Sequence, residues 1–288
     1  PATPFFVEAG GQIGDVGQIV HPVVSGANGY DDPDSPPGWQ FRVTDIHQPV
    51  TGLILHVGRM MAGTARPNDS AWASVEANRR WDIMRNHTAT HLLHKALRHV
   101  LGQHVQQAGS LVAPDRLRFD FTHPTMLTQG EVQAIESMVC QAILSNYPVR
   151  PEFHSYKGAV AAGAMALFGE KYGDQVRVIK IGDSESPYSQ ELCGGTHVNY
   201  TGDIGPFHIV SEGSVAAGVR RVEAVPGRGA NELIQKRMAV LDSAASLLGT
   251  TPDELGHKVS NLIDQLQGLE KSFEKLQRQL ARQDFERL

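Results

Sequence analysis

The sequence predicts an α+β fold with a mainly antiparallel sheet, and three patterns support it. Short alternating apolar runs fill the first part of the chain, two later stretches carry apolar residues at helical spacing, and further strand-like runs follow at hairpin distances. The 288 residues are 41% hydrophobic, which is enough apolar material for one large or two modest cores. The formal net charge of −5 is not that of a basic nucleic-acid binder, so any nucleic-acid contact must use local basic patches.

Residues 1–77 are predicted to form a small β-barrel. Runs of strand-like residues separated by Gly and Pro indicate successive short strands. These runs are Gln40 to Ile46, Leu53 to Val57 and Ala71 to Val75. We expect the barrel domain to carry the glycine-rich segment from Phe5 to Gly17.

Residues 78–227 are predicted to form an α+β domain. Apolar side chains at three- and four-residue spacing predict a long helix from Arg79 to a stop at Gly102. A second helix opens at Thr128, where Glu131 completes a capping box. A short Ala-rich helix is expected near Val160 to Leu167. Strands are expected at Ser110–Val112, Arg116–Phe121, Val149–Phe153, Val176–Ile181, Phe207–Val210 and Arg221–Val225.

Residues 228–288 are predicted to be helical. Thr251, Pro252 and Glu254 mark a helix start, and apolar residues then recur in alternating steps of four and three. The repeated positions are Leu255, Val259, Leu262, Leu266, Leu269, Phe273, Leu276 and Leu280. Two interpretations stay open: a coiled-coil seam that forms a homodimer, or a long amphipathic helix folded back on the helix expected from Asn231 to Leu248.

Two short motifs place four metal-binding side chains in two couples. His87 and His91 stand four residues apart on the long predicted helix, so both imidazoles lie on one face about one turn apart. Cys193 and His197 are also four residues apart, with two glycines between them that allow a tight turn. We favour a shared Zn²⁺ site over a buried thiol with unrelated histidines. A zincin-type protease is disfavoured, because Thr88 stands where the general-base Glu would follow the first His.

Cysteine usage and the chain ends indicate the setting of the protein. Cys140 lies in an apolar helical pattern and Cys193 has a metal-binding use, so a reduced, cytoplasmic protein is the simplest expectation. No stretch approaches the length of a membrane-spanning helix, so no membrane is expected as a partner. The absence of an initiator Met and the helical pattern at the last residues predict an excised fragment.

Six strings of residues, spread in order over nearly the whole chain, closely resemble the editing region of alanyl-tRNA synthetases. They are FFVEAGGQIGDVG from Phe5, MRNHTATHLLH from Met84, QQAGSLV from Gln106, GAMALFGEKYGD from Gly163, ELCGGTHV from Glu191 and SVAAGVRRVEAV from Ser214. The resemblance implies an ester hydrolase that deacylates tRNA(Ala) mischarged with Ser or Gly. It also implies a further C-terminal domain beyond the helical segment, and no aminoacylation by this chain.

The resemblance suggests roles for residues around the two metal motifs. Thr90 shares the helix face of His87 and His91, so it is a candidate for reading a serine hydroxyl, although a helical threonine often bonds its own backbone. The resemblance places Gln107 in the editing pocket, whereas its position alone indicates only a polar residue at the start of a strand. We assign Thr90 and Gln107 to the catalytic pocket.

Substrate contacts are expected from two further groups of residues. Gly10, Gly11 and Gln12 resemble a family loop beside the pocket, and a simple turn is the alternative. Arg220 and Arg221 are expected to contact tRNA phosphates, and the alternative is that they are solvated charges.

The ligand count bears directly on the function of the site. A zinc ion acidifies a water molecule and polarises a carbonyl, but four protein ligands close a tetrahedral site and a closed site is usually structural. We prefer three firm ligands and one exchangeable position, with His197 or His87 displaced or acting as a base. Three functions stay open: the cis-editing part of an alanine–tRNA ligase, which we favour, a free-standing trans-editing deacylase, and a zinc-stabilised tRNA-binding or dimerisation module without catalysis.

Overall fold

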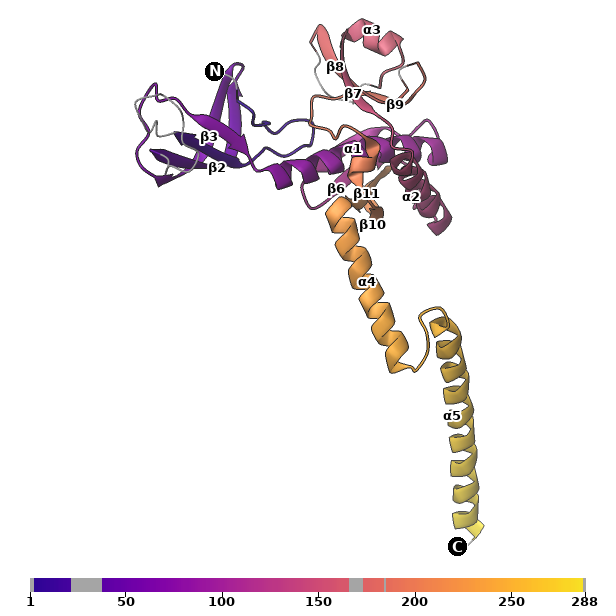
Figure 1. Cartoon of the computed structure of the whole chain (residues 1–288). Coiled ribbons are helices and arrows are strands. Elements are labelled where there is room, and N and C mark those ends of the chain that lie inside the picture. The colour runs from indigo at the N-terminus through magenta and orange to yellow at the C-terminus, as the bar shows by residue number, and fades with distance from the viewer. Residues whose placement is uncertain (1–2, 22–37, 166–172, 184, 287–288) are drawn as a thin grey trace. The chain divides into compact units, whose positions relative to one another are not determined.

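The computed structural model describes residues 3–21, 38–165, 173–183 and 185–286 (Figure 1). Its chain divides into two compact units, Pro1–Asn231 and Glu232–Leu288. The first unit contains all the described strands, in three antiparallel sheets, together with the helices that pack on them. The predicted α+β class with a mainly antiparallel sheet is therefore confirmed. The predicted division of the first unit near residue 77 stays a prediction.

The N-terminal segment forms an open four-stranded sheet in the order β3-β2-β1-β4. The strands are β1 (Gly17–His21), β2 (Trp39–Val50), β3 (Leu53–Ala62) and β4 (Trp72–Val75). Phe5, Val43 and Ile46 form the small core of this segment. A closed barrel was expected, but among the described residues the edge strands β3 and β4 are not hydrogen-bonded neighbours. Four described strands are few for a ring, since small closed barrels commonly use about five to eight.

Helix α1 (Ala77–Leu101) is the long helix that the periodicity predicts, and it ends at Gly102 as expected. Every residue from Asn86 to His94 is buried, so this stretch is enclosed on all sides and not only along an apolar stripe. Leu92, Leu93 and Leu97 are fully buried and belong to the main core. The first metal motif therefore lies on a rigid and completely packed part of the helix.

The second sheet has the order β10-β11-β6-β5 and contributes to the same core. Its strands are β5 (Gln107–Val112), β6 (Leu117–Thr122), β10 (Phe207–Ala216) and β11 (Val219–Pro226), and a short 3₁₀ helix, η1 (Thr201–Ile204), precedes β10. Helix α2 (Gln129–Leu144) contacts α1 and β10. It opens with the predicted capping box, in which the Thr128 hydroxyl and the Glu131 carboxylate each bind the backbone N–H of the other residue.

The third sheet has the order β7-β8-β9. Its strands are β7 (Val149–Ser155), β8 (Gln175–Gly182) and β9 (Pro187–Leu192), of which β9 was not predicted. The helix expected near Val160 to Leu167 is shifted: α3 (Tyr156–Ala161) starts after a Ser155 cap and ends before Gly163, whose φ of +85° stops it. Residues 166 and 167 lie outside the described part of the chain.

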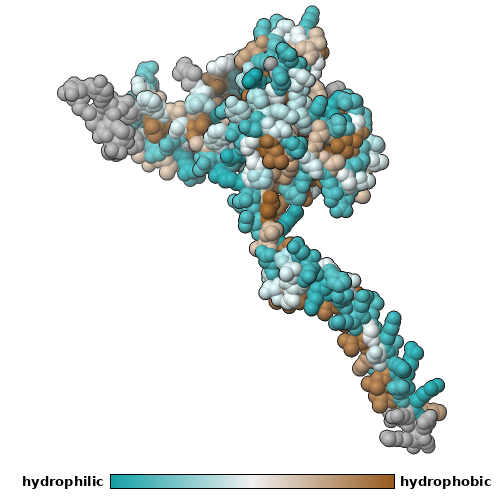
Figure 2. All heavy atoms as spheres, turned by 45° about the vertical axis from the view of Figure 1, so that its right-hand side comes forward, coloured by the Kyte–Doolittle hydropathy of each residue, from teal (hydrophilic) through white to brown (hydrophobic). Residues whose placement is uncertain are grey.

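Two helices follow strand β11 in the chain. They are α4 (Gly227–Leu247) and α5 (Leu255–Glu286), close to the predicted bounds. Within α5 the predicted apolar positions after Leu255 are exposed, from 39% at Leu262 to 68% at Leu269, and Figure 2 shows apolar side chains along this helix. No described helix combines the length and the apolar character that crossing a bilayer requires.

Candidate metal centre

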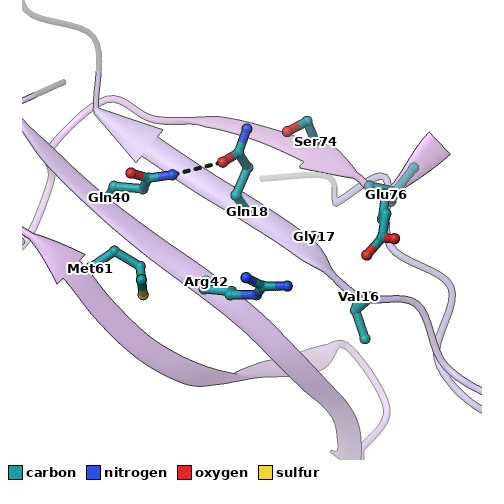
Figure 3. A pocket seen from close by; sticks show the side chains of 9 residues that line it. Val16, Gly17, Gln18, Gln40, Arg42, Met61, Ser74 and Glu76 are labelled. Carbon is teal, nitrogen blue, oxygen red and sulfur yellow. Dashed lines mark hydrogen bonds between the residues drawn. The ribbon is translucent and has the colours of Figure 1, made fainter. Parts of the chain in front are cut away.

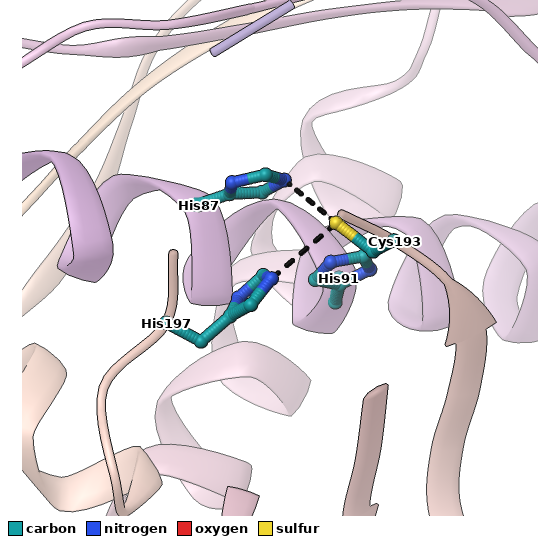
Figure 4. A group of neighbouring side chains, drawn as sticks. All are labelled: His87, His91, Cys193 and His197. Carbon is teal, nitrogen blue, oxygen red and sulfur yellow. Dashed lines mark hydrogen bonds between the residues drawn. The ribbon is translucent and has the colours of Figure 1, made fainter. Parts of the chain in front are cut away.

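The four predicted metal ligands converge at one point in the first unit (Figure 4). His87 and His91 project from α1, while Cys193 and His197 come from the loop that follows β9. One ligand atom from each residue lies within 4.8 Å of all the others. The Cys193 Sγ atom is 3.3 Å from His87 Nε2 and 3.3 Å from His197 Nε2. This cluster could hold a metal ion.

The distances in the cluster suit a small tetrahedral ion. Typical Zn–S and Zn–N bonds of about 2.3 and about 2.05 Å place sulfur and nitrogen about 3.5 Å apart around an ideal tetrahedral centre. The two measured separations of 3.3 Å are close to that value. The His91 Nε2 atom is also buried and has no hydrogen-bond partner in the described part of the chain, and a metal ion at the centre would supply one. One thiolate and three imidazoles form a donor set that suits zinc.

Each of the three histidines has its other ring nitrogen held by the protein. The His91 Nδ1 atom lies 2.8 Å from a carboxylate oxygen of Glu191, and His197 Nδ1 lies 3.3 Å from the Thr88 hydroxyl. The Thr88 hydroxyl donates to a backbone carbonyl of its own helix, so it accepts from His197. His87 Nδ1 lies 2.7 Å from the side-chain oxygen of Gln12. Such outer partners orient metal-binding imidazoles.

The charges of the cluster are shifted in the directions that metal binding needs, with one exception. Burial would raise the pKa of the Cys193 thiol, but His87 and His197 outweigh burial and hold that pKa well below its usual value of 9.0. Burial, together with His87, lowers the pKa of His197 to about 3. The exception is His91: burial opposes its charge, yet the Glu191 carboxylate raises the pKa of His91 to about 10.

A pocket of about 320 Å³ opens onto the cluster. His87, His91 and Cys193 line it, whereas His197 is not among the lining residues. Thr90, Gln107 and Gly10 also line this pocket, so the structure brings these predicted site residues together with the cluster. The pocket is near the lower end of the size range of small-molecule sites.

The comparison with known proteins agrees with the motifs. Residues 176–223 match the family described as the Threonyl and Alanyl tRNA synthetase second additional domain. Over 280 residues, 97% of the chain, the sequence is 47% identical to the alanine–tRNA ligase of Bordetella petrii. Over an alignment of 305 positions that covers the whole chain, it is 44% identical to the alanine–tRNA ligase of Roseiflexus sp.. The chain is homologous to a segment of the alanyl-tRNA synthetases. It spans only 30% and 32% of the lengths of these two relatives.

The glycine-rich segment is a tight turn next to the pocket. Backbone hydrogen bonds join Ala9 and Gln12 in both directions, and Gly10 and Gly11 have positive φ values of 58° and 82°. Gly10 faces the pocket, whereas the Gln12 side chain points into the metal cluster and is fully buried. The structure therefore shows both features that the sequence left as alternatives, a turn and a loop beside the pocket.

The two arginines expected to contact tRNA phosphates are engaged within the second sheet. Arg220 Nε donates to the Glu212 carboxylate at 2.6 Å. Arg221 pairs with Asp120 through two hydrogen bonds of 2.7 and 2.8 Å. Neither arginine lines the pocket. A phosphate would have to compete with these carboxylates for the guanidinium groups.

A second hollow, of about 310 Å³, lies on the N-terminal sheet and contains none of the predicted site residues (Figure 3). Gln18 and Gln40 face each other there across a 2.8 Å hydrogen bond, with Arg42 beside them. Its described lining has no Cys or His, so it offers neither the thiolate nor the imidazoles that zinc prefers. The predicted site residues that line a pocket all line the one at the metal cluster.

The sequence interpretation missed Glu191 as a site residue, although it stands only two residues before Cys193 in the string ELCGGTHV. Glu191 is 2% exposed and its two carboxylate oxygens lie against His91 and His94. His94 is therefore a neighbour of the cluster and not one of its four ligands. Glu191 meets His91 across 100 residues of chain, so no local spacing in the sequence marks it as a site residue.

Proposed function

We propose that this chain is the cis-editing part of an alanine–tRNA ligase and hydrolyses the aminoacyl ester of tRNA(Ala) mischarged with Ser or Gly. The observation that carries the proposal is the cluster of His87, His91, Cys193 and His197, three of which line a pocket, in a chain homologous to a segment of that family. When bound there, zinc supplies Lewis-acid polarisation of the ester carbonyl. The partner in this proposal is the acylated 3′ end of tRNA(Ala).

Thr90 gives the pocket a means of recognising serine. Its hydroxyl donates to the Asn86 carbonyl at 2.8 Å, so its oxygen is left as an acceptor for the hydroxyl of a seryl group. An aminoacylation site that selects alanine rejects serine only weakly, because a small added group changes binding by only about 1 to 3 kcal/mol. A second site that accepts a hydrogen bond from the seryl hydroxyl can hydrolyse the seryl-tRNA(Ala) that the aminoacylation site fails to exclude. Gln107, on the same pocket wall, supplies an amide for the ester or the ribose.

The test is the rate at which the purified chain deacylates tRNA(Ala) charged with serine, compared with tRNA(Ala) charged with alanine. We expect fast loss of serine with alanine spared. Cys193→Ala should reduce the seryl rate at least about 100-fold, because a metal ligand is removed. Cys140→Ala is the matched control, since this other cysteine lies on α2 and, among the described residues, its thiol hydrogen-bonds only the backbone carbonyl of Phe207.

One specific observation favours a second function, a zinc-stabilised module that binds tRNA without catalysis. All four donor atoms lie within 4.8 Å of one another, and a closed four-ligand site is usually structural. Such a module would bind zinc and tRNA(Ala), would not hydrolyse the ester, and would lose much of its thermal stability in Cys193→Ala. Seryl hydrolysis by the intact chain contradicts this alternative. Hydrolysis with equal rates for serine and alanine would contradict the proposed selectivity.

A further inference from the structure

We infer that Gln12 is a positioning residue of the metal centre, which locks the two metal motifs to each other through one side-chain amide. Gln12 lies 75 residues before His87 and 184 residues before Thr196, and it contacts both. Its side chain is fully buried. Unlike Gly10, it does not line the pocket, so it is not placed to touch a substrate. The inference rests on the metal-binding part of the proposed function.

The hydrogen bonds around Gln12 leave only one orientation of its amide. The Thr196 backbone N–H donates to Gln12 Oε1 at 2.8 Å, and a backbone N–H can only donate. The other amide atom, Nε2, then donates to the Thr196 hydroxyl at 3.0 Å. An amide in the reverse orientation would direct two N–H donors at each other, so the backbone itself identifies which atom is oxygen.

This orientation fixes the tautomer of His87. The His87 Nδ1 atom lies 2.7 Å from Gln12 Oε1, and that oxygen can only accept, so Nδ1 must carry the hydrogen. His87 Nε2 is then left with its lone pair, and it points at the Cys193 sulfur 3.3 Å away. One glutamine oxygen therefore holds a ligand of α1 and the backbone of the Cys193–His197 loop at the same time.

The backbone around Gln12 is itself held against β5. Val112 N–H donates to the Gly11 carbonyl at 2.7 Å, and Ile13 N–H donates to the Val112 carbonyl at 3.2 Å. A Cβ atom on Gly11 would lie 2.6 Å from the Ser110 carbonyl oxygen, so only glycine allows this approach. Gly195, in the loop of Cys193 and His197, also allows a close approach that a larger residue would block. A Cβ atom there would lie 2.0 Å from His87 Cε1 and 2.7 Å from Gln12 Oε1. The close approaches at Gly11 and Gly195 therefore hold the Gln12 amide against the metal centre.

Three variants test this role with zinc as the probe. Gln12→Met keeps the length of the side chain but removes all three hydrogen bonds, whereas Gln12→Glu keeps the oxygen that accepts from His87 and Thr196. Gln18→Met is the matched control, since Gln18 lies in the same N-terminal segment but its side chain hydrogen-bonds only Gln40 among the described residues. Zinc dissociation constants are measured on the full chain by competition with a chromophoric chelator, and the cobalt-substituted proteins are compared by their visible absorption spectra.

We expect Gln12→Met to weaken zinc binding about 10- to 100-fold and to change the cobalt spectrum, with Gln12→Glu close to the wild type and Gln18→Met unchanged. Wild-type zinc affinity in Gln12→Met overturns the inference. So does equal weakening in Gln12→Glu and Gln12→Met with an equal loss of melting temperature, because a packing role would explain that result. A wild-type chain without zinc affinity overturns both this inference and the metal part of the proposed function. Normal zinc results in a chain that does not deacylate seryl-tRNA(Ala) would remove the proposed function alone.

Discussion

Each histidine of the cluster donates its Nδ1 hydrogen to a different kind of oxygen. His87 meets an amide, His197 a hydroxyl and His91 a carboxylate, which is the only charged one of the three. A charge-assisted hydrogen bond is stronger than a neutral one, so the three rings are not equivalent as ligands. In the absence of a metal ion, Glu191 keeps a proton on both nitrogens of His91 at neutral pH, because it raises the pKa of that residue to about 10.

Zinc uptake should therefore release a proton from His91 at pH 7. His91 Nε2 can bind a metal only after losing its hydrogen, and the raised pKa means that zinc affinity increases as the pH rises from 7 towards 10. Calorimetry in buffers of different ionisation enthalpy should show about one proton released per zinc. In Glu191→Gln the release should fall to about half or less, since the charge that raises the pKa is gone.

The control for this measurement is Glu152→Gln. Glu152 also pairs with a histidine, His154 at 2.8 Å, but lies on β7 and contacts none of the four ligands. Its replacement should leave the released proton unchanged. Unaltered release in Glu191→Gln would show that the proton comes from another group.

Thr90→Val should separate the two mischarged substrates. The change keeps the shape of the side chain but removes the oxygen that we propose accepts from the seryl hydroxyl. Because one hydrogen bond contributes about 0.5 to 1.5 kcal/mol, kcat/KM for seryl-tRNA(Ala) should fall up to about tenfold. Glycine has no hydroxyl, so deacylation of glycyl-tRNA(Ala) serves as the internal control and should stay within about twofold. Equal losses for both substrates would argue against this role of Thr90.

The sequence predicted the helices that have regular apolar spacing or a capping box, but it did not predict β9, which carries polar side chains of the site. Helix α1 follows from its periodicity and its stop at Gly102, and α2 follows from its capping box. Strand β9 was missed because two of its inward positions are polar, Ser189 and Glu191, and an apolar pattern cannot reveal them.

In the candidate site, the residues that lie close together in sequence were predicted, and their partners from distant parts of the chain were not. The four ligands were predicted because each couple lies within five consecutive residues. Their outer partners were not, since Gln12 and Glu191 meet His87 and His91 across 75 and 100 residues of chain. Contacts over such separations depend on the packed fold and leave no periodic trace in the sequence.

At the start of α2, Thr128→Ala should lower the free energy of unfolding by about 1 kcal/mol. The hydroxyl of Thr128 satisfies the backbone N–H of Glu131, which has no partner inside the helix. Urea titration of both proteins would measure the difference. Ser145→Ala at the other end of the same helix is the control, because the Ser145 hydroxyl only bonds back to the Gln141 carbonyl and the change should cost less than about 0.5 kcal/mol. Equal effects of the two changes would contradict the cap.

On α5, the exposed apolar positions predict self-association of the chain. Leu269 is 68% exposed on a stripe with the spacing of a coiled-coil seam. We expect sedimentation velocity to show a dimer whose proportion grows with concentration. Leu269→Lys should shift it to the monomer, whereas Gln267→Lys, two residues away and outside the seam, should not. A wild-type chain that sediments as a monomer throughout would favour the other interpretation, in which the stripe packs against α4.

In the whole molecule, the cluster ties together parts of the chain that are far apart in sequence. His87 and Cys193 are separated by 106 residues. An ion that binds only the folded state stabilises it by about 4 kcal/mol at a concentration 1,000 times its dissociation constant. We therefore expect a chelator to lower the melting temperature of the zinc-loaded protein by about 10 °C, and added zinc to restore it. Cys193→Ala should melt at the same temperature with and without chelator, and a chelator effect there would place the stabilising metal elsewhere.

The link between Gln12 and Thr196 has a consequence for the synthesis of the protein. Gln12 emerges from the ribosome first and its partner follows 184 residues later. At a synthesis rate of about 5 to 20 residues per second, that delay is about 10 to 40 s. The N-terminal strands need only residues up to Val75 to pair, so they have time to fold while the Gln12 amide still contacts water. The nascent chain therefore has a folded N-terminal sheet before its metal site is complete. Zinc cannot bind all four ligands until His197 has emerged from the ribosome.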